Sequence, residues 1–175
     1  RSADLVSGST LYVGDTELHV AAGSSTGTAV STYSANGTPI AERSTSAGVS
    51  GSVVKWLGTD AQNSATLEVD RVSGAVTRRY VDPFGNTRGT AAAWSSSHGF
   101  LNKTVDAFTG LDMVGARQYD PGLGRFTSVD AVLAPANPQQ NNGYSYAANN
   151  PVTMSDPAFN DPHAEDCSGV CHYVT

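Results

Sequence analysis

Short runs of alternating apolar and polar residues, separated by turn formers, fill the first half of the chain. Residues 9–23 (STLYVGDTELHVAAG) alternate on both sides of Gly14 and Asp15, and residues 28–43 (TAVSTYSANGTPIAER) do so around Asn36 and Gly37. Alternation over four to eight residues is typical of a half-buried strand, and Asn-Gly is a strong signal for a two-residue type I′ turn. The pattern predicts two antiparallel hairpins.

The same pattern continues to residue 85. Residues 52–60 (SVVKWLGTD) read as a strand, and Leu67 and Val69 alternate with polar neighbours in the run that follows. Ser73 and Gly74 are expected to turn the chain, and residues 76–81 to return it. Such alternation predicts antiparallel sheets with one covered face.

Three turns share a weak internal repeat, in which an aromatic residue ends a strand and a glycine follows the turn. They are YSANG at 33–37, YVDPFG at 80–85 and YDPGLG at 119–124. A tyrosine at this position can stack on the neighbouring hairpin, and the glycine can adopt a positive φ. Beyond them, residues 89–108 read as loop with one short strand at Phe100, and residues 135–150 as an irregular cap with one helical turn near residues 144–148.

Composition supports an all-β chain. Of the 175 residues only 15% are charged and 18 are glycine, which suits short strands and tight turns around a single core with a tail. The net charge is −6, and Arg78 and Arg79 form the only adjacent basic pair, so neither nucleic acid nor an anionic membrane is an expected partner. No apolar run is long enough to span a bilayer, and the first ten residues lack the apolar core of a signal peptide. Either a signal has been removed or the sequence is part of a longer chain.

The second half carries a dense series of motifs in a fixed order. They are TGL at 109–111, ARxYDPxxGRF at 116–126, SxD at 128–130, YxYxxNNPV at 144–152 and DP at 156–157. In these motifs the chain resembles the Rhs/YD-repeat family over residues 11–157, and most closely the segment called the Rhs repeat-associated core. The resemblance is strong because five motifs agree in order and in approximate spacing.

The resemblance implies a spiral β-shell built from YD-type hairpins, with an irregular C-terminal plug. It divides the chain into YD-repeat-like hairpins at 1–88, the core and plug at 89–160, and a tail at 161–175 in the cargo or toxin position. Related shells enclose toxic domains in bacterial polymorphic toxins, which act in interbacterial competition, and in insecticidal toxin complexes; others occur in teneurins. The implied location is secreted or cell-surface and bacterial. The implied partners are the rest of an Rhs shell and a C-terminal cargo, with self-association through strand edges as a further option.

Many bacterial relatives cleave themselves at the end of this core, through an aspartate of the SxD segment and one of a terminal DPxGL motif. By resemblance, Asp130 and Asp156 are the candidate catalytic pair, since one carboxyl can polarise the carbonyl while the other activates water. The cleavage site falls at Phe159 and Asn160, where the family has glycine and leucine, so the resemblance predicts impaired cleavage in cis.

Two further positions near the candidate pair depart from the family pattern, and three charged residues lie close to it in sequence. Ala131 replaces a usual proline, and Val129 an arginine found in insecticidal toxins. Arg117, Asp120 and Arg125 are possible supporting residues; one arginine would steer a carboxylate, or both would pair with Asp120 or nearby carbonyls. Asp-Pro pairs also commonly start turns, which is the structural alternative for Asp82, Asp120, Asp156 and Asp161.

The tail contains the two cysteines, Cys167 and Cys171, flanked by His163 and His172. A disulfide, a metal site, an expanded haem-attachment motif and a plain extended tail all remain open there. No metal or cofactor is expected in the main body. Two alternatives to the shell segment stand beside it: a secreted or cell-surface β-hairpin binding or adhesion module without protease activity, and a secreted enzyme that cuts other molecules.

Overall fold

The computed structural model describes residues 2–4, 8–46, 48–130, 142–155 and 172–173, and these divide into two compact units. Unit 1 comprises Arg1–Thr59, Ala65–Arg79 and Ala91–Ser97, and unit 2 comprises Asp60–Ser64, Tyr80–Thr90 and His98–Thr175. Each unit is described by itself.

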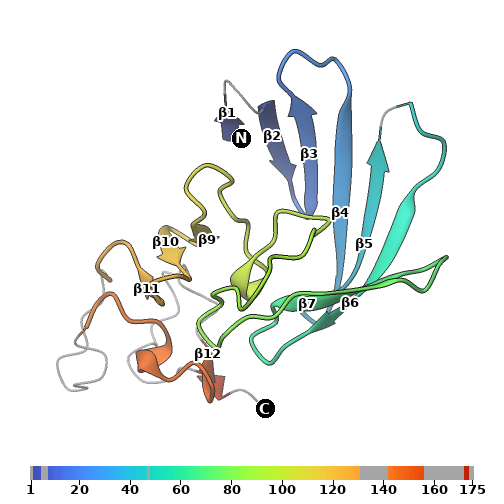
Figure 1. Cartoon of the computed structure of the whole chain (residues 1–175). Helices are drawn as coiled ribbons and strands as arrows, with labels where there is room; N and C mark the ends of the chain where they lie inside the picture. Colours follow the sequence, from blue (N-terminus) through green and yellow to red (C-terminus); the bar gives the residue numbers. More distant parts are fainter. Residues whose placement is uncertain (1, 5–7, 47, 131–141, 156–171, 174–175) are drawn as a thin grey trace. The chain divides into compact units, whose positions relative to one another are not determined.

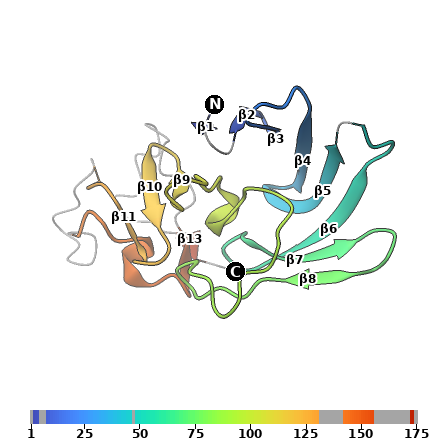
Figure 2. The same ribbon diagram turned by 45° about the horizontal axis from the view of Figure 1, so that its top comes forward.

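Unit 1 is built on one antiparallel sheet of eight strands in which every strand pairs with its neighbours in sequence, β1 to β8 (Figures 1 and 2). This order confirms the predicted all-β succession of hairpins. The strands are β1 Ser2–Asp4, β2 Gly8–Val13, β3 Thr16–Ala21, β4 Gly27–Ala35, β5 Thr38–Ser46, β6 Val53–Thr59, β7 Ala65–Asp70 and β8 Val76–Arg78.

Turn residues set the register of these hairpins. Asn36 and Gly37 both have positive φ, 50° and 78°, as a type I′ turn between β4 and β5 requires. Gly14 (φ 57°) turns β2 into β3, and Gly74 (φ 70°) lies between β7 and β8. The returning strand after Gly74 is shorter than expected and ends at Arg78.

The covered face of this sheet is its polar face. Strand pairing places Glu17, Glu42 and Glu68 on the same face, and all three are buried. Leu67 and Val69, which the alternation pattern highlighted, lie on the opposite face of β7 and are only partly buried. Alternation therefore indicated the two faces correctly, but hydrophobicity does not identify the covered one.

The opposite face carries a row of apolar side chains across five strands. The paired positions run from Tyr33 on β4 through Ala41, Trp56 and Val69 to Val76 on β8. Ala41 is buried, while Tyr33, Trp56 and Val76 are 49%, 51% and 58% exposed. Trp56 is thus a surface residue.

Unit 2 has a small core surrounded by short strands and turns. Its three-stranded sheet has the order β11-β10-β9, and β12 pairs with β13. A 3-10 turn, η1, occupies Phe100–Asn102, so the strand expected at Phe100 is wrong; Leu101 and Asn102 take positive φ there. The remaining elements are β9 Asp112–Val114, β10 Arg117–Asp120, β11 Arg125–Phe126, η2 Ala147–Asn149, β12 Met154–Ser155 and β13 His172–Tyr173.

Four aromatic rings form the centre of this core: Phe100, Tyr119, Phe126 and Tyr146. Tyr119 lies within 5.3–5.5 Å, centroid to centroid, of the other three. Edge-to-face and offset arrangements at this spacing add stability beyond the area that the rings bury. The core fixes β10 and β11, which carry the residues singled out by the ARxYDPxxGRF motif.

Candidate functional site

Arg117 is a buried charged residue of unit 2. It pairs with Val114 in the β9–β10 register, and its side chain is 9% exposed. The guanidinium carbon lies 3.8 Å from the centroid of the Phe126 ring, a cation–π contact. The planar guanidinium can stack on the ring and still donate hydrogen bonds from its edge.

The edge of this guanidinium meets Asp130. Arg117 Nη2 lies 3.1 Å from Asp130 Oδ2, and Nη1 donates a hydrogen bond of 3.2 Å to the Gly143 carbonyl. The Asp130 amide donates to the same carbonyl at 2.8 Å. The Asp130 side chain is 27% exposed, so the carboxylate is held by Arg117 and still open to solvent, while the Asp130 backbone is fixed by its own hydrogen bond. Such a group is positioned and accessible to water.

Gly143 lets these segments approach closely. A Cβ on this residue would lie 3.1 Å from the Asp130 amide nitrogen and 3.2 Å from Val129 Cγ2, closer than ordinary van der Waals contact. A larger residue at 143 would push Asp130 away from Arg117. The sequence motifs do not include this glycine, and nothing in the sequence distinguishes it from other turn glycines.

Asp120 ends β10 and Arg125 begins β11. The Asp120 carboxylate accepts a hydrogen bond of 3.1 Å from the Leu123 amide, which is the turn-capping geometry common for Asp before Pro. Arg125 pairs with Asp120 in the β10–β11 register and is exposed. The structure therefore brings Arg117, not Arg125, to Asp130.

Two shallow clefts border the YDP turn. One of about 220 Å³ is lined by Asp82, Phe84, residues 121–125, Asn142, Ser145 and Asn149. The other, of about 270 Å³, is lined by Asp120, Leu123, Arg125, Phe126, Thr127 and Tyr144. Asp82 uses its carboxylate locally, accepting hydrogen bonds from the Phe84 and Asn86 amides.

The two tyrosines of the aromatic core also form hydrogen bonds with neighbouring segments. The Tyr119 hydroxyl donates to the Phe84 carbonyl at 2.8 Å, and burial raises the pKa of this phenol far above its ordinary value of 10. The Tyr146 hydroxyl donates to Gln62 Oε1 at 2.7 Å, and Gln62 Nε2 in turn donates to the carbonyls of Pro151 and Met154. These bonds link three separate segments of unit 2. Gln62 lies outside the sequence motifs, and its role was not predicted.

The other half of the predicted catalytic pair lies outside the described residues. Asp156, Phe159 and Asn160 belong to the range 156–171, as do Cys167 and Cys171. The geometry of an Asp130–Asp156 pair and the alternatives for the cysteines remain predictions. Within the described ranges, no helix is long and apolar enough to cross a membrane. The same ranges hold no group of three or more His, Cys, Asp or Glu side chains suited to a metal ion.

Unit 1 contains a polar array that the sequence analysis missed. Residues 91–97, named the serine strap here, place three consecutive serines against the three buried glutamates. Ser97 Oγ donates to Glu17 at 2.6 Å and Ser96 Oγ to Glu42 at 2.5 Å. The available signal was the unusual run SSS at 95–97 together with one glutamate in each of three predicted strands.

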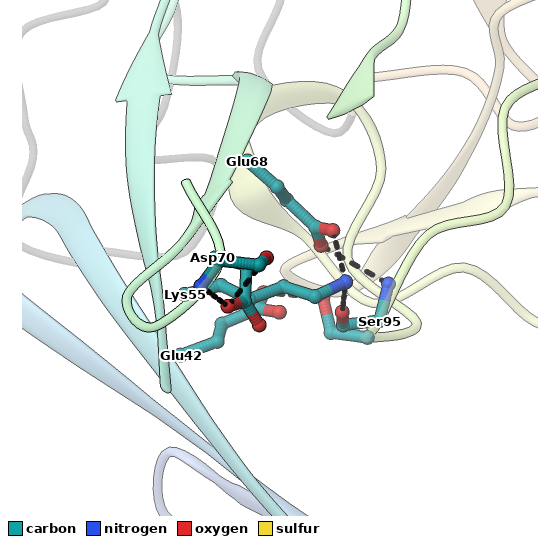
Figure 3. Close-up of polar contacts among 7 residues, drawn as sticks. Glu42, Lys55, Glu68, Asp70 and Ser95 are labelled. Carbon is teal, nitrogen blue, oxygen red and sulfur yellow. Dashed lines mark hydrogen bonds and ion pairs between the residues drawn. The ribbon is translucent and has the colours of Figure 1, made fainter. Parts of the chain in front are cut away.

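The third contact includes a lysine. Lys55 Nζ lies 2.5 Å from Glu68 Oε2 and 2.5 Å from Ser95 Oγ, and the Ser95 amide donates to Glu68 Oε1 at 3.1 Å (Figure 3). Asp70 points away into its own turn, where hydrogen bonds from the Ser73 amide and hydroxyl, then the Val72 amide, lower the pKa of its carboxyl.

The sheet of successive hairpins and the YDP turn on its aromatic core define an all-β YD-repeat module. The family model described as "Teneurin YD-shell" matches residues 54–152, more than half of the chain, and the chain belongs to this Rhs/YD-repeat family.

Three solved structures share this fold. The structure titled "TcdB2-TccC3-TEV" is 24% identical with a TM-score of 0.71, and alignment covers 86% of this chain and 8% of that chain. "TcdB2-TccC3 without hypervariable C-terminal region" is 24% identical with a TM-score of 0.70, and its alignment covers 86% of this chain and 8% of that chain. "TcdB2-TccC3-Cdc42" is 24% identical with a TM-score of 0.69, and its alignment covers 85% of this chain and 7% of that chain. The chain thus spans less than a tenth of these structures' length. No curated protein matches the chain.

Proposed function

We propose that this chain is the terminal segment of a toxin-encapsulating Rhs-type shell and carries a degenerate aspartyl self-cleavage site that would separate core from C-terminal cargo. The observation that supports the site is the fixed Asp130 carboxylate, held by the buried Arg117 and still open to solvent. Membership of the YD-shell family supports the shell role.

The proposed reaction is hydrolysis of the peptide bond after residue 160. Asp130 takes a proton from the attacking water, and the carboxyl of Asp156 donates a proton to the carbonyl oxygen of the scissile bond. The proton taken up by the pair then goes to the leaving amine, so that water is added across the bond. Arg117 acts as a positioning residue, since its contact is with Asp130. Because the two carboxyl groups titrate together, apparent pKa values belong to the pair.

Phe159 and Asn160 are expected to impair this reaction. A glycine at 159 would allow backbone conformations that phenylalanine resists, and a leucine at 160 would fill an apolar pocket that asparagine does not. The proposed partners are the remainder of the shell and the cargo, in a bacterial protein that is secreted or displayed at the cell surface. The open edges of β1 and β8 offer a second way for copies to associate.

The test is the intact mass of the freshly purified, denatured chain, compared with a variant in which Ala158-Phe159-Asn160 is restored to Ser-Gly-Leu. The parent is expected to be whole, and the restored chain to split after residue 160. Adding Asp130→Asn or Asp156→Asn to the restored chain should abolish the split. Asp82→Asn removes the carboxyl of another Asp-Pro pair, one that accepts hydrogen bonds within its own turn, and serves as the matched control.

Arginine variants test the positioning role. In the restored chain, Arg117→Gln is expected to slow cleavage at least tenfold, whereas Arg125→Gln, at an exposed position in the same motif, should leave the rate unchanged. Equal effects from the two arginines would contradict the role assigned to Arg117. If the restored chain never splits, the catalytic pair is refuted.

One observation favours a binding module as a second candidate. The row of Tyr33, Trp56 and Val76 leaves apolar surface exposed across the open face of unit 1, and such rows commonly mark interaction surfaces. Failure of every variant to split would make this the leading function. Replacing Trp56 with serine should then abolish binding to a captured partner while the far-UV circular dichroism remains unchanged.

A further inference from the structure

The serine strap closes over a face of the sheet that holds more negative than positive charge. Glu17, Glu42 and Glu68 come from alternate strands, β3, β5 and β7, and each accepts hydrogen bonds from one of the three serines. Lys55 neutralises Glu68 through direct contact at 2.5 Å. Among the described residues, Glu42 forms no such ion pair.

Glu42 is the least compensated of the three. Its side chain is 2% exposed, Oε1 accepts the Ser96 bond, and Oε2 has no hydrogen-bond partner among the described residues. Thr32 Oγ1, on the same face of the neighbouring strand, is also buried without a partner in this part of the chain. Glu17, by contrast, accepts bonds from both the amide and the hydroxyl of Ser97.

A buried carboxyl with one oxygen unpaired is far more stable neutral than ionised, because an unsolvated charge costs much more than a neutral acid. Burial accordingly raises the pKa of Glu42 above its ordinary value of 4.5. The Ser96 bond opposes this rise, the carboxylates of Glu68 and Glu17 add to it, and the positive charge of Arg79 opposes it.

We propose that the serine strap is a pH-sensitive clasp, closed while Glu42 carries a proton and released at its centre when that proton is lost. Ionised Glu42 regains hydration if residues 91–97 lift from the sheet, and the strap has no regular secondary structure to hold it down. Acid therefore tightens the clasp and alkali loosens it.

The other charged groups around Glu42 do not supply this switch. They are Glu17 on β3, Lys55 on β6, Glu68 and Asp70 on β7, and Arg79 just after β8. Glu68 is paired with Lys55, and Asp70 bonds to its own turn. Glu17 accepts hydrogen bonds from both the amide and the hydroxyl of Ser97. Arg79 stays charged at all relevant pH values.

The direction and steepness of the pH dependence of strap opening follow from the difference in Glu42 protonation between the closed and the open strap. Below pH 4.5 Glu42 is protonated in both the closed and the open strap, and the clasp is fully stable. Between that value and the raised value of the closed form, opening releases one proton, so the opening equilibrium constant rises up to about tenfold per pH unit. Above the raised value both forms are ionised, and the constant reaches a plateau.

Trp94 provides the measurement, because it lies within the strap and Arg79 stacks 4.1 Å from its ring centroid. The chain has two tryptophans, so Trp56→Phe leaves Trp94 as the reporter. In this background, Trp94 emission and amide hydrogen exchange of residues 91–97, corrected for the intrinsic rate, are followed from pH 4 to 9. The expected result is a sigmoidal increase in opening of at least tenfold.

Three variants test whether Glu42 is the group whose loss of a proton opens the strap. Glu42→Gln keeps an acceptor for Ser96 and cannot ionise, and it is expected to remove the pH dependence while retaining protection. Glu17→Gln should keep the dependence and move its midpoint to lower pH, since one neighbouring negative charge is gone. Ser96→Ala should move the midpoint to higher pH, because the ionised form loses its donor.

The opposite shifts keep the proposal testable even if Glu42→Gln fails to fold, which far-UV circular dichroism would reveal. A parent strap whose protection does not change from pH 4 to 9 would overturn the proposal. So would a pH dependence that survives in folded Glu42→Gln, or midpoints in the Glu17 and Ser96 variants that move in the same direction.

Discussion

Replacing Lys55 with methionine tests how far the buried Glu68 depends on its cation. The two side chains are unequal: Glu68 is 1% exposed, whereas Lys55 is 25% exposed. Methionine keeps most of the apolar stem of lysine and removes the charge. The change therefore leaves a buried carboxylate with only the Ser95 amide as a donor among the contacts described above.

The magnitude follows from the contact distance. At 2.5 Å and an effective dielectric constant of 20, the gross attraction is about 7 kcal/mol, much of which is offset by the desolvation of both charges. Breaking a fully buried pair costs about 3–5 kcal/mol. Water already reaches Lys55, so the expected loss of unfolding free energy for Lys55→Met is about 2–3 kcal/mol, a fall in Tm of about 4–12 °C.

Removing the carboxylate should cost much less. Glu68→Gln can still accept a hydrogen bond from the Ser95 amide and leaves no buried charge, so about 1 kcal/mol is expected. The double variant should resemble Glu68→Gln, which would give a coupling energy of about 2–3 kcal/mol. Lys103→Met, at the chain's other lysine, is the matched control and should change stability by less than about 0.5 kcal/mol.

The assay is denaturant unfolding followed by far-UV circular dichroism, with hydrogen exchange of β6 and β7 to locate the change in unit 1. The reasoning fails if Lys55→Met is as stable as the lysine control. It also fails if Glu68→Gln is as destabilising as Lys55→Met, because the penalty would then come from lost contacts and not from an unpaired charge.

Two further predictions concern hydrogen bonds within single units. Tyr146→Phe leaves the buried Gln62 Oε1 without its donor and should destabilise unit 2 by about 1–3 kcal/mol; a Gln62→Leu/Tyr146→Phe pair that costs no less than the two singles combined would contradict a direct bond. Ser73→Ala removes a donor from Asp70, so the pKa of that carboxyl should rise toward its ordinary value of 3.8 in an NMR titration. Because the folded pKa is lowered, the contribution of Asp70 to stability is present above pH 3.8 and is lost as the pH falls through the folded value, a loss that should shrink in Ser73→Ala.

Most of the sheet could be predicted because its hairpins are specified locally. Asn36 and Gly37 determine a turn through their own conformational preferences, and the flanking residues alternate with the period of a strand. Local information of this kind also locates Gly14 and Gly74. It does not identify the covered face, because burial of Glu17, Glu42 and Glu68 depends on a segment that joins them from 27 to 80 positions away.

The segment around Phe100 was harder to predict because its conformation is set by tertiary contacts. Phenylalanine is common in strands, which favoured a strand at Phe100. In the structure the Phe100 amide donates to the buried Asp112 carboxylate, and the Leu101 amide donates to Ser64. These bonds hold a tight turn that no propensity would favour, with positive φ at Leu101 and Asn102.

In the candidate site, too, the sequence predicted which residues take part, whereas their contacts depend on the tertiary structure. The order of motifs identified Arg117, Asp120, Arg125 and Asp130 as neighbours in sequence, but not which arginine meets the carboxylate. That choice depends on side-chain direction in β10 and β11, where Arg117 points to the Phe126 ring and Arg125 to solvent.

The strict neighbour-to-neighbour order of β1 to β8 has a consequence for folding during synthesis. Each strand needs only the strand made just before it, so the sheet can grow from the N-terminus as the chain leaves the ribosome. The serines that cover Glu17, Glu42 and Glu68 are made after all eight strands, at residues 95–97. Until then these carboxylates face water, where they are well solvated and keep the unfinished sheet from burying that face against another nascent chain.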